Sequence, residues 1–440
     1  MKKSYKTKIR GLSKKQLDRL KELSNSAKNL YNQALYILKN EYKTTQKHLS
    51  YYEMDKIMKQ TLNLESEINY KKLKAGVSQQ ILKKLDINFS SFFKAIKSYS
   101  KDKSKFKGCP KPPKFIKDNY YNLIYDNIRF QVKNDFIVLE KALKDENGEI
   151  LVDKLEIKIP KYLIGKKINQ IEIIPKYGYF EAIFVYEDTK NYKQIAKNKN
   201  VVGIDLGLNN LATVVSNGIF KPFIINGKPL KSINQFYNKI MAKLKSRLDK
   251  GEQKWSKRLQ KLTDNRNNKM KDYLHKSSQK IVEECINNDI STVVIGNVAN
   301  SNNKINLGKR NNQNFVNISL GQFVEKLKYK LEAHNIDVKV VEESYTSKAS
   351  FIDNDKLPKK LDIAKKFKFS GVRVKRGLYK PLNAIFKKVN ADCNGAYNII
   401  RKVVPNFSFE ELSKKVNDGI AGWFLPHIKI IDMSIKVNVN

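Results

Sequence analysis

Hydrophobic and polar positions alternate with different periods along the chain and divide it into blocks. From residue 13 to about residue 100, apolar residues recur every three or four positions, which predicts amphipathic helices. Residues 4–10 alternate with a period of two, as a short strand does, and Gly11 ends the run. Three prolines within 110–113 exclude a helix there and indicate a rigid basic connector.

Between residues 119 and 190, short alternating runs are separated by polar turns such as 145–148. This pattern predicts a small β domain, to which we also assign the strand at 4–10. The expected strands are 128–132, 136–139, 155–159, 171–174 and 179–186.

From residue 198 onward, apolar strand-like runs alternate with helical stretches, which indicates an α/β domain. Three strands are followed by a long, highly charged helical stretch at 231–287, and then by strand, helix, strand and helix. The expected elements are strands 201–206, 211–215, 220–225, 293–295 and 338–343, and helices 315–333 and 391–404. This is the element order of an RNase H fold, in which strands one, four and five are parallel neighbours. Ligands of such sheets collect at the carboxyl ends of the strands.

A carboxylate lies near the end of the first of these strands. Asp205 follows the apolar run 201–204 and precedes Leu206 and Gly207. Burying an unpaired carboxylate is costly, so a metal ion or a partner is expected to compensate it. The segment resembles the first strand of a RuvC/RNase H-type nuclease. The alternative is a plain strand that ends in a turn-forming Asp-Leu-Gly.

A second carboxylate, Asp392, lies in the first turn of the last expected helix. The small residues Ala391, Gly395 and Ala396 around it allow close packing. Two-metal phosphodiester cleavage needs several carboxylates that converge on divalent ions, and hard cations prefer oxygen ligands. Asp205 and Asp392 would supply two of them. The alternative for Asp392 is an ordinary helix N-cap.

The composition points to a polyanionic partner. The chain has 86 Lys+Arg against 43 Asp+Glu, a formal net charge of +43 that is spread along its length. Repulsion among so many like charges is reduced when the protein binds nucleic acid, and the binding is favoured because counterions leave the phosphates.

No apolar run reaches 18 residues and no basic-then-apolar leader opens the chain, so we expect a cytoplasmic, nucleoid-associated protein without membrane or small-molecule partners. Three cysteines and four scattered histidines form neither a disulfide framework nor a zinc motif.

Three segments together resemble the TnpB (OrfB) proteins of insertion sequences, which are RNA-guided DNA endonucleases and relatives of type V CRISPR effectors. They are 203–207 (GIDLG), 345–348 (YTSK) and 390–399 (NADCNGAYNI). The resemblance implies a guide RNA, double-stranded target DNA and catalytic Mg²⁺ or Mn²⁺. It implies four parts: a first strand (1–12) of a β-barrel-like wedge domain, a helical recognition domain (13–115), the rest of the wedge (116–197), and a RuvC-like nuclease domain (198–440).

The sequence departs from that family in two places. The glutamate that TnpB proteins place at the end of strand four is Gly296 here. The four-cysteine motif expected after Tyr-Thr-Ser-Lys is missing, so the basic insertion 346–389 is expected to fold without zinc. The first departure leaves open a nuclease-inactive, RNA-guided repressor.

A relocated glutamate would restore the site. The resemblance implies that it can lie three residues before the threonine of the Thr-Ser pair, which is Glu343 here. Neighbouring strands lie ~4.8 Å apart, so a glutamate ending strand five can reach the place that Gly296 leaves vacant. Glu342 is the second choice, because alternate residues of a strand face opposite sides. The bland alternative is that both are solvent-exposed ends of a strand.

We therefore predict an RNA-guided endonuclease with Asp205, Glu343 and Asp392 as catalytic metal ligands. The alternatives are the nuclease-inactive repressor and a guide-independent DNA-binding accessory protein of transposition. The candidate nucleic-acid contacts lie in two basic segments of the nuclease domain and are Lys309, Arg310, Arg373, Lys375 and Arg376.

Overall fold

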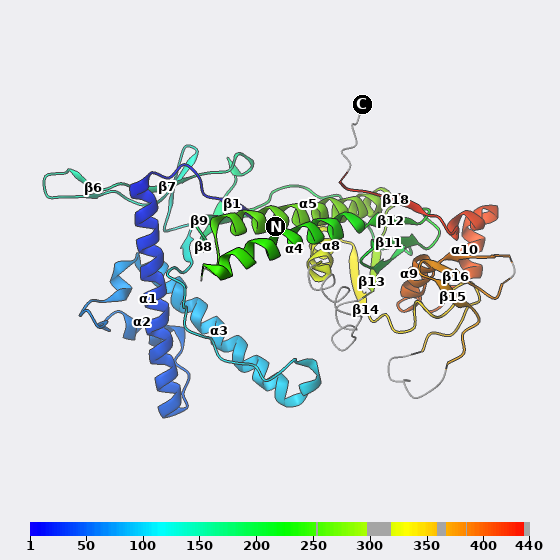
Figure 1. The fold of residues 1–440 in the computed structure, drawn as a ribbon, viewed down its shortest axis with the longest axis horizontal. Coiled ribbons are helices and arrows are strands. Elements are labelled where there is room, and N and C mark those ends of the chain that lie inside the picture. The colour runs from blue at the N-terminus through cyan, green and yellow to red at the C-terminus, as the bar shows by residue number, and fades with distance from the viewer. Residues whose placement is uncertain (252–253, 297–317, 359–366, 384, 435–440) are drawn as a thin grey trace. The chain divides into compact units, whose positions relative to one another are not determined.

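The chain folds as two compact units, Met1–Lys190 and Asn191–Asn440. The computed structural model describes residues 1–440 apart from 252–253, 297–317, 359–366, 384 and 435–440 (Figure 1). Among the described residues, no helix is both long and apolar enough to cross a membrane.

The first unit combines helices with three small sheets. Its elements are β1 (Lys2–Lys8), α1 (Lys14–Thr45), α2 (Tyr51–Met58), η1 (Asn69–Lys72), α3 (Ala75–Lys101), η2 (Lys103–Lys105), β2 (Leu123–Asp126), β3 (Gln131–Lys133), β4 (Phe136–Glu140), β5 (Leu143–Lys144), β6 (Ile150–Val152), β7 (Leu155–Lys158), η3 (Lys161–Leu163), β8 (Ile168–Lys176) and β9 (Tyr179–Glu187).

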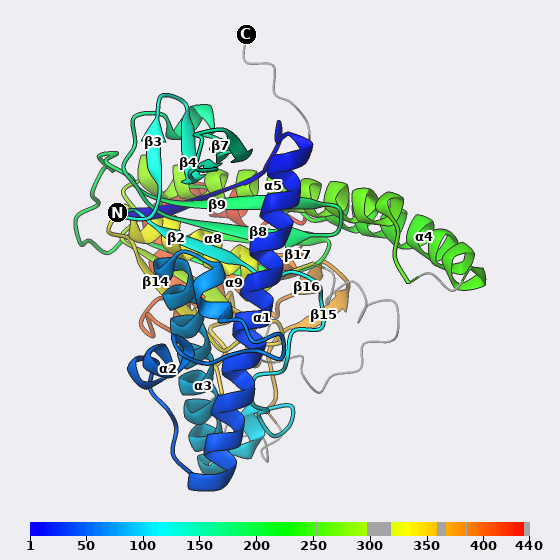
Figure 2. The ribbon, with the colours of Figure 1, turned by 90° about the vertical axis from the view of Figure 1, so that its left-hand side faces the viewer.

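Helices and strands of this unit share one hydrophobic core, in which Leu30 of α1 and Leu82 of α3 belong to the same cluster as Phe184 of β9. The helices α1 and α3 pack side by side (Figure 2). The main sheet has the order β1-β9-β8-β2, and the pairing of β1 with β9 confirms that the amino-terminal strand joins the β region. The strand expected at 128–132 is wrong in its bounds, because Ile128 lies in the turn between β2 and β3 and is 80% exposed.

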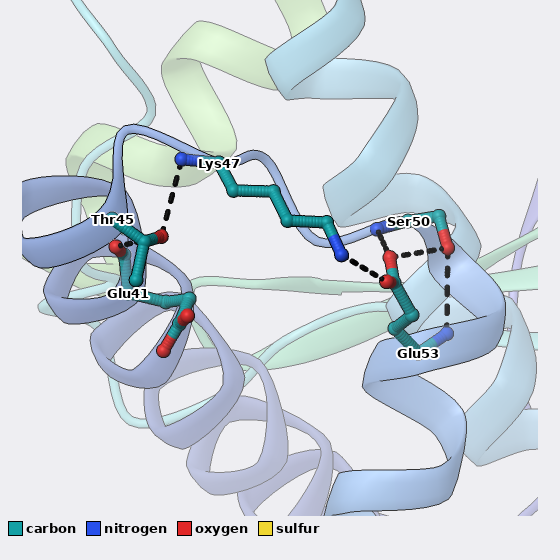
Figure 3. A network of polar contacts seen from close by, with 5 residues as sticks. All are labelled: Glu41, Thr45, Lys47, Ser50 and Glu53. Atoms are coloured by element: carbon teal, nitrogen blue, oxygen red, sulfur yellow. Dashed lines mark hydrogen bonds and ion pairs between the residues drawn. The ribbon is translucent and has the colours of Figure 1, made fainter.

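The joint between α1 and α2 is fixed by a local polar network (Figure 3). Ser50 caps α2: its Oγ accepts from the Glu53 amide, and the Glu53 carboxylate accepts from the Ser50 amide at 2.8 Å. The same carboxylate pairs with Lys47 Nζ at 2.9 Å. Thr45 Oγ1 accepts from the Lys47 amide and donates to the Glu41 carbonyl. This capping arrangement satisfies helix-end groups that would otherwise have no partner.

The second unit is built on a six-stranded sheet of order β14-β13-β10-β11-β12-β18. Its elements are β10 (Val201–Leu206), β11 (Asn210–Ser216), β12 (Phe223–Asn226), α4 (Lys228–Lys250), α5 (Lys257–Asn287), β13 (Thr292–Gly296), α8 (Leu320–Glu332), β14 (Asp337–Val341), β15 (Val372–Lys375), β16 (Leu378–Lys380), β17 (Val389–Asn390), α9 (Ala391–Arg401), α10 (Phe409–Val416), η5 (Asn417–Trp423) and β18 (Lys429–Ile431).

Strands one, four and five of the expected order are parallel neighbours in the structure. β10 pairs with β13, and β13 pairs with β14, so that Val202, Val293 and Val338 lie in register. This confirms the RNase H-like arrangement of the sheet. The fifth strand ends at Val341, two residues earlier than expected, so Glu342 and Glu343 lie beyond its end.

The two faces of this sheet carry different layers. Val202 and Ile204 of β10 point into a core shared with α5 and α8. Val201 points to the opposite face, where α9 packs. Because side chains alternate along a strand, Gly203 and Asp205 lie on the α9 face as well.

The approach of α9 to β10 leaves no room for a side chain at Gly203. A Cβ atom there would lie 2.4 Å from the carbonyl oxygen of Ala396 and 2.7 Å from Cγ1 of Ile400. Glycine is therefore what lets the helix backbone lie directly on the strand, and this contact brings the start of α9 to the end of β10.

We predict that Gly203→Ala lowers the free energy of unfolding by about 2–3 kcal/mol, because overpacking against backbone cannot be relieved by a rotamer change. Thermal or chemical unfolding of the full chain measures this. Gly321→Ala is the matched control: nothing lies within 4 Å of a Cβ at that position in α8, so its stability should be unchanged or slightly higher. Equal stability of the two variants would contradict the close-approach account.

Candidate active site

The carboxylate of Asp205 lies at the carboxyl end of β10, where it faces the first turns of α9. A Cβ added to Gly395 of α9 would lie 3.0 Å from Asp205 Oδ2. Glycine at this position thus makes room for the carboxylate, as Gly203 makes room for the helix. The two glycines bring the end of the strand and the start of the helix close enough to share a site.

Asp392 enters the site from the first turn of α9. The N-cap of that helix is Asn390, whose Oδ1 accepts from the amides of Asp392 and Cys393 at 3.0 and 3.1 Å. The N-cap alternative for Asp392 is therefore wrong, and its carboxylate is available for other partners. Asp392 Oδ2 accepts a 2.6 Å hydrogen bond from Asn210 Nδ2, at the start of β11. The sequence analysis did not single out Asn210.

Glu343 occupies the space that Gly296 leaves open at the end of β13. A Cβ built on Gly296 would lie 2.2 Å from Glu343 Oε1 and 2.8 Å from its Cγ. The same Oε1 is buried and has no hydrogen-bond partner among the described residues. A buried carboxylate oxygen without a partner is costly and marks a place where a ligand is expected.

Glu342 is directed to other partners. Its Oε1 accepts from the Ser344 amide at 2.7 Å, and its Oε2 lies 3.8 Å from Lys402 Nζ. Of the two adjacent glutamates, Glu343 is the one that contacts the Gly296 position. The alternative in which both are solvent-exposed strand ends is wrong for Glu343.

The three carboxylates influence one another electrostatically. Burial raises the pKa of Asp205 well above its usual value, and the charges of Glu343 and then Asp392 raise it further. Burial also raises the pKa of Glu343 to about 7, with a smaller contribution from Glu342. Like charges held together in a desolvated place are unfavourable unless a cation compensates them.

Arg373, in β15, supplies part of that positive charge. Its Nη2 lies 3.5 Å from Asp392 Oδ1, and its charge acts to lower the pKa of Asp205. The sequence analysis placed Arg373 among nucleic-acid contacts; the structure places it at the carboxylates. Lys375 and Arg376 of the same hairpin are exposed, whereas Lys309 and Arg310 lie outside the described residues.

The donor set suits a hard divalent cation. Asp205, Glu343 and Asp392 offer carboxylate oxygens, which Mg²⁺ and Mn²⁺ prefer, and one of these oxygens is buried without a partner. Within the described parts of the chain, no three His, Cys, Asp or Glu side chains are already close enough around one point to hold an ion.

Two buried amides of α9 anchor the segment that follows Glu343. Asn394 Nδ2 donates to the Ala349 carbonyl at 2.8 Å and its Oδ1 accepts from the Phe351 amide at 2.9 Å. Asn398 Nδ2 donates to the carbonyls of Thr346 and Ala349. The sequence analysis used these asparagines only as part of a motif. Their spacing of four in an otherwise apolar helix face was the available signal for a buried polar role.

The basic insertion is closed by two aspartates. Asp353 accepts from the amides of Leu382 and Asn383 at 2.9 and 2.8 Å. Asp355 accepts from the amide of Ser350 at 2.7 Å, and from both the amide and the hydroxyl of Ser370. These bonds connect segments up to 30 residues apart in sequence. They hold together the insertion that carries Arg373.

Two family models match parts of the chain from residue 183 onward. A family described as "Probable transposase" (OrfB_IS605) matches residues 183–302, and the Cas12f1-like TNB domain matches residues 321–399. Among curated proteins, none matches the sequence.

Solved structures of Cas12f1, Cas12f and C2c1 are similar to this chain. A Cas12f1–sgRNA–target DNA complex is 17% identical over 87% of this chain and 82% of that chain, with a TM-score of 0.53. A CRISPR-Cas12f ternary complex is 17% identical over 87% and 81%, with a TM-score of 0.33. The C2c1 protein of Alicyclobacillus acidoterrestris with single-guide RNA is 9% identical over 89% and 66%, with a TM-score of 0.39. The first likeness shows a shared fold.

We predict that Asp355→Ala loosens the insertion, because three donors lose their acceptor at once. Limited proteolysis should cut the 346–389 segment several-fold faster than in the wild type, while zinc or a chelator should change neither rate. Asp145→Ala is the control: its carboxylate accepts two backbone amides, but only within its own turn. Unchanged proteolysis of the Asp355→Ala insertion would contradict the assigned role.

Proposed function

This chain is TnpB-like in sequence and Cas12f-like in fold, and on that premise we propose that it is an RNA-guided DNA endonuclease of an insertion sequence. The observation that carries the proposal is the position of Glu343. Its unpartnered carboxylate oxygen lies against Gly296, where TnpB proteins place a glutamate. The charge missing from strand four is thus supplied from the segment after strand five.

The three carboxylates would hold the divalent ions that such cleavage needs. Asp205 and Asp392 come from β10 and α9, and Glu343 completes the set from the segment after β14. Bound Mg²⁺ or Mn²⁺ would supply an activated water and stabilise the leaving oxygen. Asn210 orients the Asp392 carboxylate through its 2.6 Å bond. Arg373 is placed to take up the phosphodiester charge once Asp392 has a metal partner.

The guide RNA and the target DNA are proposed partners. The net charge of +43 favours binding to polyanions, and the similar solved structure is titled as a complex with sgRNA and target DNA. In such systems base pairing selects the target, while the protein recognises a short flanking motif and backbone shape. The helical and β region of the first unit would then act as the recognition and wedge parts.

One observation favours a second candidate function. Strand four carries glycine in place of the expected glutamate, which would suit a nuclease-inactive, RNA-guided repressor if Glu343 did not bind metal. A guide-independent accessory protein of transposition would need no RNA at all. The RNA that co-purifies with the protein, the cleavage rate and guided DNA binding together separate these three functions.

We expect the protein to purify with one discrete transcript from its own locus, because a guided nuclease holds its RNA stably. Sequencing the RNA bound to the full-length protein after a high-salt wash measures this. Random host RNA that salt removes would instead indicate general polyanion binding, and would leave the accessory-protein function as the better explanation.

We expect Glu343→Gln to slow cleavage of guided DNA about 100-fold or more, because the amide keeps the size but removes the charge that holds a divalent ion. Glu342→Gln, at the neighbouring residue, should retain most of the activity, since Glu342 pairs with Ser344 and Lys402 instead. Cleavage rates with Mg²⁺ at saturating target measure both variants. A wild-type rate for Glu343→Gln would exclude the relocated site.

Further variants separate loss of chemistry from loss of binding. Asp205→Ala and Asp392→Ala should abolish cleavage while guided DNA binding remains, and a chelator should stop the wild type. Gly296→Ala should also reduce cleavage, because its Cβ would displace the Glu343 carboxylate. Absence of cleavage by the wild type with guide and Mg²⁺, together with intact binding, would favour the repressor.

A further inference from the structure

A hollow of about 380 Å³ lies along the seam between the antiparallel helices α4 and α5. Its lining residues are spaced by three or four positions on each helix, so they form the facing sides of the pair. They include Phe236 and Ile233 from α4, and Leu262, Asn265 and Lys269 from α5. The volume is within the range of ligand-binding pockets. The carboxylates of the candidate active site do not line it.

An exposed aromatic ring stands in this hollow. The side chain of Phe236 is 64% exposed, although it lines the hollow together with apolar neighbours such as Ile233 and Leu262. A single exposed aromatic residue needs no explanation by itself. Here the exposed ring and two cationic residues line the same hollow of ligand size, and this combination calls for an explanation.

Arg266, one of the two cations that line the hollow, is held in place by the helix pair. Arg266 Nε and Nη2 donate to Oδ1 of the fully buried Asn234 at 2.8 and 2.5 Å. The Arg266 guanidinium also lies 5.6 Å from the centre of the Tyr237 ring, whose hydroxyl is 3.2 Å from Thr263 Oγ1. This wall of the hollow is therefore preorganised. Lys269, one turn further along α5, is exposed.

The surrounding helices are strongly basic. Asp249 is the one acidic residue in the sequence of α4, whose cations are Lys228, Lys231, Lys239, Lys243, Lys245, Arg247 and Lys250. An apolar ring among positive charges matches the two parts of a nucleotide, a base that stacks on aromatic side chains and a phosphate that pairs with Lys or Arg. An apolar peptide would use the ring but not the charge.

We propose that this hollow binds one unpaired nucleotide of RNA, with its base on Phe236 and its phosphate at Lys269. The hydroxyl of Ser232 and the carboxamide of Asn265 line the same hollow and are the partners for a ribose 2′-OH, the group that distinguishes RNA from DNA. The inference rests on the proposed function in one respect, that the chain binds RNA. It adds a site on α4 and α5 that needs neither the metal nor the target.

The test uses the RNA-free full-length protein and a fluorescent oligouridine, with no metal and no target DNA. Phe236→Ala should weaken binding about tenfold without changing its salt dependence, because the ring carries no charge. Phe236→Trp should bind at least as well as the wild type. Lys269→Ala should weaken binding and reduce the slope of log affinity against log salt by about one. Thermal unfolding of each variant should match the wild type.

Two controls decide the interpretation. Ile430→Ala removes a comparably exposed apolar side chain (58%) from the same unit and should leave the affinity unchanged. Oligothymidine of equal length should bind more weakly than oligouridine and respond less to Phe236→Ala. An equal response of both oligomers would overturn the assignment to RNA, and an unchanged affinity of Phe236→Ala for both would overturn the site. Absence of any RNA binding by the wild type would instead contradict the proposed function.

Discussion

The direct contact of α9 with β10 is the constraint on which the candidate site of the second unit depends. A helix backbone lies against a strand only where neither element projects a side chain, and Gly203 provides that place on the strand. Gly395 provides the matching space on the helix, beside the Asp205 carboxylate. The two aspartates are far apart in sequence, and this contact brings them to one edge of the sheet. If α9 lay slightly farther from β10, the carboxylates of Asp205 and Asp392 would be too far apart to share a site.

This arrangement has an unfavourable electrostatic component. Packing holds Glu343 and Asp392 near the buried Asp205 although their charges raise its pKa, so the packing opposes the repulsion among the carboxylates. Arg373 offsets part of the repulsion from the basic insertion, and the Asp353 and Asp355 hydrogen bonds hold that insertion together. The second unit thus contains a cluster of negative charges within a chain whose net charge is strongly positive.

Periodicity sufficed for most elements, because alternation and helical spacing are local properties of the sequence, and the order of the sheet was expected from the likeness of the element order to an RNase H fold. The parallel β10, β13 and β14 strands lie as expected. The end of β14 was placed two residues too late: the apolar residues end at Val341, and the expected strand was extended over Glu342 and Glu343. The hydrogen-bond partners of Asn210, Asn394 and Asn398 could not be predicted from local pattern, because each partner is distant in sequence. Whether Glu343 binds metal remains a prediction.

The insertion that carries Arg373 is held by carboxylate oxygens and backbone amides, and the sequence between 346 and 389 contains no cysteine. Thiolate ligands are lost to oxidants and to competing chelators, whereas hydrogen bonds between aspartate and amide groups respond to neither. Cys393, next to Asp392, is buried, and burial raises the pKa of its thiol, which keeps it unreactive. The described contacts that hold this insertion together are consequently ones that oxidants and metal chelators do not break.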